Sequence, residues 1–97
     1  MLTLVHPDGS WERILYEGGE KIRVIQELVF GSTITYTKYS AAQVPLEAQI
    51  ENDSSTIVGP INSEKQPHGM CIETFKNGDW ISGEWENGRL VRKLEEQ

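Results

Sequence analysis

The chain has 97 residues, 15 of them acidic and nine basic, so its formal net charge at neutral pH is -6. Surplus negative charge repels phosphate backbones and anionic lipid surfaces, so we expect neither nucleic acid nor a membrane as a direct ligand. A hydrophobic content of 37% exceeds that of disordered chains, and the length suits one hydrophobic core, so we expect a single domain over residues 1–97.

Residues 1–40 are expected to form β-hairpins. Short strands at residues 2–5 and 10–16 flank a turn at Asp8 and Gly9. Residues 21–30 are rich in Val, Ile and Phe, which favours a strand, although their apolar positions also suit one face of a helix. Residues 32–40 alternate threonines with larger side chains, which is the period-2 pattern of a strand.

The middle of the chain, residues 41–69, is expected to be an irregular connection. Residues 41–50 have the only appreciable helix potential, and Pro45 limits it to a turn or two of helix. Loop-like composition follows, then a brief strand at residues 56–58 and a polar connection at 59–69. The predicted fold class is therefore mainly β, a single small domain of antiparallel hairpins or a meander with at most one short helix.

Two Asn-Gly pairs enclose the strand-like residues 79–85 near the C-terminus. Asn-Gly favours a type I′ hairpin turn, because both central residues of that turn need positive φ. Two such turns predict three antiparallel strands within residues 70–94. With Gly9 in the corresponding place of the first hairpin, the predicted structural turn residues are Gly9, Asn77, Gly78, Asn87 and Gly88.

A weak internal repeat relates the two ends of the chain. Setting Asp8-Gly9 over Asn77-Gly78 aligns Trp11 with Trp80, Tyr16 with Trp85, Glu17 with Glu86 and Gly19 with Gly88. A repeat at fixed spacing is a signature of hairpin or solenoid arrays. Two hairpins that each follow turn chemistry independently would give the same alignment, so both explanations stay open.

Residues 68–92 resemble a MORN repeat, a β-hairpin unit with Asn/Asp-Gly turns and a Gly-x-Trp motif, through Asn77, Gly78, Asp79, Gly83, Trp85, Asn87 and Gly88. Residues 6–23 resemble a degenerate unit. The sequence departs from the family pattern where Ile81 replaces an aromatic residue and where Cys71 and Lys93 replace glycines. The resemblance implies open sheet edges that are covered by dimerisation or by a partner. It also suggests membrane lipids, which the acidic charge opposes.

Trp80, Ser82 and Glu84 share one face of their predicted strand. A partly exposed tryptophan beside polar groups is typical of an interface anchor, and Trp11 occupies the aligned position of the first hairpin. The predicted partner-binding residues are Trp80, Trp11, Glu84 and Tyr36. The alternative for both tryptophans is burial under an edge of the sheet.

No arrangement of residues in the sequence predicts catalysis, so we expect no enzyme, no catalytic residues, no metal and no cofactor. His6, Asp8 and Ser10 are the residue types of a hydrolase triad, but they lie in one turn, where a linear relay cannot form. Cys71, in an apolar setting, is expected to be buried and unreactive. A pocket assembled from distant residues, such as a histidine with Glu84 and Cys71, remains an alternative.

The leading hypothesis is a small non-catalytic protein-interaction module: an adaptor, inhibitor or assembly factor that binds another protein, or forms a homodimer, through a sheet face and exposed aromatics. The alternative is an acidic inhibitor of a basic nucleic-acid-binding protein. A lone cysteine fits a reducing compartment, and the sequence shows no export signal and no long apolar run. A cytoplasmic location is therefore expected.

Overall fold

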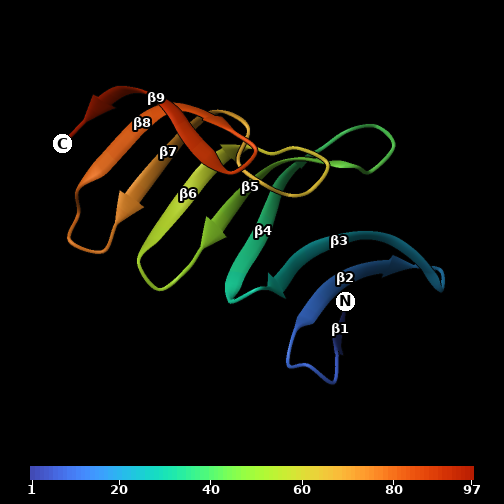
Figure 1. Cartoon of the computed structure of the whole chain (residues 1–97). Coiled ribbons are helices and arrows are strands. Elements are labelled where there is room, and N and C mark those ends of the chain that lie inside the picture. The colour runs from blue at the N-terminus through green and yellow to red at the C-terminus, as the bar shows by residue number, and fades with distance from the viewer.

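The computed structural model describes all 97 residues and contains nine β-strands and no helix. Every strand pairs antiparallel with the next one in sequence, so the sheet is a single open meander (Figure 1). The predicted fold class is confirmed. The strands are β1 (Leu2–Val5), β2 (Trp11–Glu17), β3 (Glu20–Val29), β4 (Ser32–Tyr39), β5 (Pro45–Glu51), β6 (Ser55–Pro60), β7 (Gly69–Phe75), β8 (Trp80–Glu86) and β9 (Arg89–Glu96).

The segment 41–69, expected to be irregular, contributes two of these strands. β5 forms where helix potential was expected, and β6 is longer than the brief strand expected at 56–58. Pro45 is compatible with β5 because it is the first residue of the strand, one of the few places where a sheet tolerates proline. The longest irregular part of this segment is the loop 61–68 between β6 and β7, with short connections at 41–44 and 52–54.

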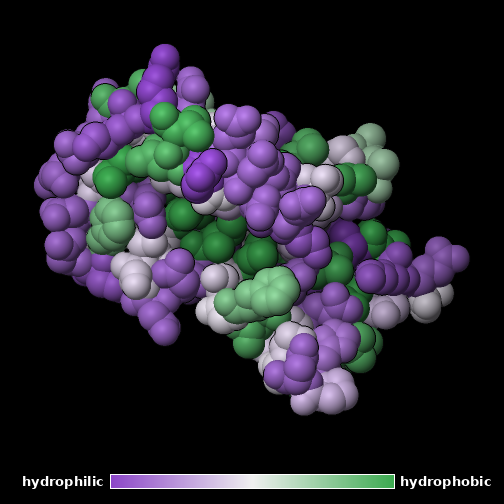
Figure 2. All heavy atoms as spheres, viewed as in Figure 1, coloured by the Kyte–Doolittle hydropathy of each residue, from purple (hydrophilic) through white to green (hydrophobic).

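One row of directly paired residues crosses all nine strands and defines what we call the inner face. Paired residues on neighbouring strands project from the same face, so this row is continuous. The row is Leu4, Glu12, Glu27, Ile34, Ile50, Ile57, Glu73, Ile81 and Glu96. Ile34, Tyr36 and Ala48 form the buried centre of the core. Figure 2 shows apolar side chains gathered in the hollow over β4, β5 and β6.

The loop 61–68 is held against the inner face by a charged contact. Lys65 Nζ lies 2.9 Å from Glu27 Oε2, and the Tyr36 hydroxyl donates a hydrogen bond of 2.7 Å to the same oxygen. The Glu27 side chain is only 8% exposed. Strands otherwise contact only their neighbours in sequence, so Lys65 ties the loop to a strand 38 positions away in the chain.

The β2–β3 turn and the β8–β9 turn match in type. Gly18 and Gly19, like Asn87 and Gly88, are two-residue turns in which both φ values are positive, as a type I′ turn requires. The turn at Asn77-Gly78 differs from this expectation, because only Gly78 has positive φ, at 95°. There Phe75 N donates to Asp79 O (2.8 Å) and Gly78 N donates to Phe75 O (3.0 Å).

The turn at Gly9 has the same hydrogen bonds as the turn at Gly78. His6 N donates to Ser10 O at 2.9 Å, and Gly9 N donates to His6 O at 3.0 Å. The two units also share their bulges. β2 shifts register against β3 at Arg13/Ile14 and at Leu15/Tyr16, and β8 shifts against β9 at Ser82/Gly83 and at Glu84/Trp85, 69 residues later in each case (82 − 13 = 69). The N-terminal unit, β1–β3, and the C-terminal unit, β7–β9, therefore have the same turns and the same bulges. Their central strands, β2 and β8, are both seven residues long.

Candidate functional site

Trp11 and Trp80, the two predicted anchors, project from the face opposite the core, which we call the outer face. They belong to one row of paired residues that crosses eight strands: Val5, Trp11, Leu28, Thr33, Glu51, Thr56, Thr74 and Trp80. Both indoles are half-buried. Six strand spacings of about 4.8 Å separate them by roughly 29 Å along the sheet. The structure thus places both on one face without bringing them into contact.

An exposed apolar patch lies beside Trp80 on the outer face. Val58 is directly opposite Ile72, and Met70 is the next residue of β7 on the same face. The three residues are 46%, 50% and 52% exposed. Contiguous exposed apolar side chains with polar surroundings mark interaction surfaces more often than scattered ones do. We call Val58, Met70, Ile72 and Trp80 the outer patch.

Glu84, the third predicted partner-binding residue, stands at the rim of the outer patch. It pairs directly with Met70, and its Oε1 lies 3.4 Å from Nη2 of Arg92. Met70, Glu84 and Val91 line a shallow hollow of about 280 Å³ that continues the outer patch toward β9. The rim is therefore charged, and its centre is apolar.

Tyr36, the fourth predicted partner-binding residue, is instead a core residue that is 6% exposed. It lies on the inner face, where the loop 61–68 covers it, and its hydroxyl is engaged by Glu27. Burial and this hydrogen bond raise the pKa of the Tyr36 hydroxyl far above its usual range. Tyr36 cannot contact a partner without displacing the loop.

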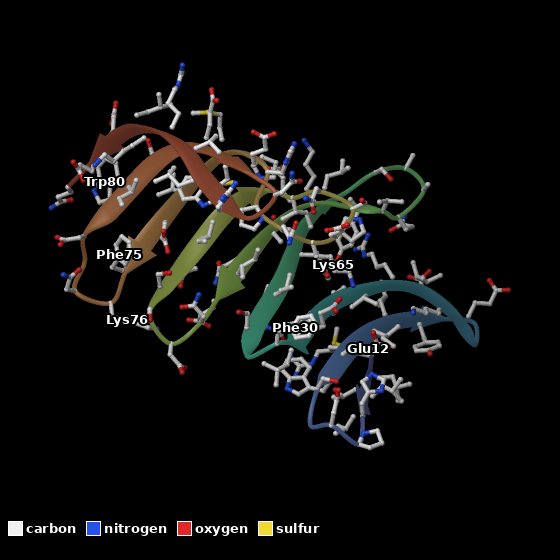
Figure 3. All side chains as sticks on the ribbon, viewed as in Figure 1. Glu12, Phe30, Lys65, Phe75, Lys76 and Trp80 are labelled. Atoms are coloured by element: carbon white, nitrogen blue, oxygen red, sulfur yellow. The ribbon has the colours of Figure 1, made fainter.

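Phe30 is an exposed aromatic residue that sequence reasoning missed. It is fully exposed at the β3–β4 turn and has φ of 50°, a left-handed conformation that bulky side chains rarely adopt. Figure 3 shows it on the same turn-bearing edge of the sheet as Phe75 and Trp80. The signal in the sequence was the dipeptide Phe30-Gly31 between two strand-like runs, where a turn needs positive φ and Asn or Asp is usual.

The residues considered for catalysis fall into separate places. The Ser10 hydroxyl donates to Asp8 Oδ1 at 2.6 Å, and this bond is the main cause that lowers the pKa of Asp8. His68 and Glu84 line the same hollow, but Cys71 is not among the residues that line it. Cys71 is buried, its Sγ lies 3.6 Å from Pro60 O, and burial raises the pKa of its thiol.

No three His, Cys, Asp or Glu side chains are grouped closely enough to hold a metal ion. No helix of the structure is long and apolar enough to cross a membrane.

No family model, no curated protein and no solved structure matches the chain. The choice of the outer patch as the candidate site therefore rests on the exposure of its apolar side chains and on the charged residues at its rim.

Proposed function

We propose that this protein is a small non-catalytic interaction module that binds a partner protein across the outer face. The contiguous exposure of Val58, Met70 and Ile72 beside Trp80 is the observation that carries this proposal. Protein interfaces combine an apolar, aromatic-rich centre with a polar rim. The outer patch has this composition, with Glu84 and Arg92 at its rim.

The partner that fits best has an apolar centre flanked by basic residues. Glu51 and Glu95 project from the outer face and belong to none of the ion pairs of the protein. Together with the net charge of -6, these carboxylates favour a basic partner. In one version of this proposal, charge dominates the binding free energy, and the module is an inhibitor that blocks a basic nucleic-acid-binding protein.

Two features of the sequence belong to the same proposal. The MORN-like character of residues 68–92 is supported by the geometry that this unit shares with the N-terminal hairpins, including its turns and bulges. The single cysteine, Cys71, is free and buried, which supports a reducing compartment such as the cytoplasm. Repeated hairpin units serve as binding scaffolds because they present an extended, regular face.

A pull-down from native-host lysate at two salt concentrations tests this proposal. The baits are wild type, Trp80→Ala, Ile72→Ser and the control Ser63→Ala, whose exposed side chain lies in the loop 61–68, on the inner face of the sheet. We expect one stoichiometric partner that the wild type and the control retain and that both outer-patch variants lose. Equal retention by all four baits, or the absence of any partner, would contradict the proposal.

The salt arm and a mass measurement separate the versions of this function. Capture that disappears between about 0.05 and 0.5 M salt favours the acidic inhibitor, because exposed ion pairs are screened over these concentrations. Capture that survives favours the apolar patch. Light scattering that reports a dimer of this chain, dissociated by Ile72→Ser, would identify a second copy as the partner.

A further inference from the structure

A second site lies on the other side of the sheet, where three of the nine basic residues line one hollow. Lys21, Arg23 and Lys65 come from β3 and the loop 61–68, and the hollow has a volume of about 240 Å³. Glu27 is the one acidic residue that lines it. The lining therefore has a net charge of +2 (3 − 1 = 2), in a protein whose overall charge is -6.

The negative charge of Glu27 is already compensated. Its carboxylate pairs with Lys65 and accepts the Tyr36 hydroxyl. Lys21 and Arg23 belong to none of the ion pairs of the protein. Two cations without a carboxylate partner beside a neutralised glutamate attract an anion, because a recess with surfaces of low dielectric focuses their field.

Arg23 is held in position for such a ligand. Its Nη1 donates to Gln43 Oε1 at 3.0 Å, and its guanidinium lies 4.4 Å from the centre of the Tyr39 ring. Its Nε is buried and has no acceptor. The guanidinium thus has more N–H donors than acceptors around it. Because two contacts already restrict its motion, it loses little conformational entropy when it binds an oxyanion.

The backbone at the hollow is strained. Four non-glycine residues of the chain have positive φ, and two of them, Gln43 (66°) and Lys65 (64°), line this hollow. They lie in different loops, β4–β5 and β6–β7, that converge on β3. Strained conformations of this kind concentrate at sites that clamp ligands. Figure 3 shows Lys65 where its loop meets β3.

We infer that this hollow binds the phosphate group of a small anionic ligand. A planar guanidinium binds two oxygens of a phosphate at once, and the unpaired ammonium group of Lys21 adds a second positive charge that favours a dianion over a monocarboxylate. The volume accommodates a phosphate with a small organic substituent. The site shares no residue with the outer patch, so it stands independently of the proposed protein partner.

An NMR titration of the whole chain with inorganic phosphate tests the assignment, with sodium chloride at equal ionic strength as the reference. We expect saturable shifts of the Gln43 and Lys65 amides and of the Arg23 side chain, and weaker binding of acetate. Arg23→Gln should weaken phosphate binding by about tenfold or more, because it removes charge-assisted hydrogen bonds. The matched control is Arg89→Gln, an exposed arginine in β9, which should bind like the wild type.

Lys21→Gln is a second test variant whose effect cannot be attributed to misfolding, because the Lys21 side chain is exposed and makes no hydrogen bond within the protein. It should weaken binding severalfold without changing the amide spectrum elsewhere. Shifts that chloride reproduces, an affinity that neither variant changes, or acetate binding as tightly as phosphate would each overturn the inference.

Discussion

Trp11 and Trp80 are the first residues of β2 and β8, occupy equivalent positions in two units of the same geometry, and project from one face of the sheet. Trp85, the third tryptophan, lies on the opposite face and is 4% exposed. The sheet therefore sorts its three indoles, two toward the outer face and one toward the core.

Fluorescence quenching by acrylamide measures this sorting. In the Trp85→Phe variant, acrylamide should quench the remaining emission efficiently, because the two remaining indoles, Trp11 and Trp80, are only half-buried and stay accessible to it. The double variant Trp11→Phe/Trp80→Phe should emit from the core and resist quenching. Equal quenching constants for these two proteins would contradict the placement of the tryptophans.

Substitution of Gly88 by Val should lower the free energy of unfolding by about 1 kcal/mol or more, because a β-branched residue tolerates positive φ poorly. Gly88 has φ of 87°, and Gly78 has φ of 95°, so Gly78→Val should behave alike. Gly88→Asn is the control, since asparagine accepts this conformation. Urea denaturation provides the measurement, and unchanged midpoints for both valine variants would show that these turns are wrongly assigned.

Lys65→Met should destabilise the protein by about 1–3 kcal/mol, because Glu27 would keep a nearly buried charge with one partner fewer. The double variant Glu27→Leu/Lys65→Met should recover part of this loss, since the uncompensated charge disappears. Urea denaturation of the four members of this cycle yields the coupling free energy. Additive effects of the two substitutions would contradict the contact between the loop and β3.

Alkaline solution should destabilise the protein through Tyr36. Burial and the Glu27 hydrogen bond raise the pKa of this hydroxyl in the folded state, so the folded chain binds more protons than the unfolded chain above the ordinary tyrosine value. The stabilising contribution is complete below about pH 10 and is lost as the pH rises beyond it. Tyr36→Phe should be less stable at neutral pH, and its stability should fall less steeply above pH 10. Parallel curves for the two proteins would refute this assignment.

Local sequence chemistry was sufficient for most of the architecture. Alternation over residues 32–40 and the Asn-Gly pairs encode strands and turns through neighbouring residues alone, and the structure has strands there. β5 was missed because its alanine, leucine and glutamate suggest a helix. Pairing with β4 and β6 outweighs that weak propensity, as tertiary context often does.

The candidate sites depended on contacts that no local pattern encodes. Tyr36 looked like an exposed aromatic residue because nothing near it in sequence predicts that Lys65 will cover its ring. The outer patch needed the register between β6 and β7, which places Val58 opposite Ile72. Trp80 and Glu84 were assigned to one face correctly, since period 2 within a single strand suffices for that assignment.

The meander also determines how cooperative this molecule can be. Because each strand meets only its predecessor and its successor, the free energy of folding approximates a chain of nearest-neighbour terms, as in a one-dimensional lattice. Such a chain frays from its ends, and the loss of β1 or β9 exposes a fresh edge without opening the centre. A protein built in this way can gain or lose a terminal hairpin by duplication or truncation while the remaining strands keep their register.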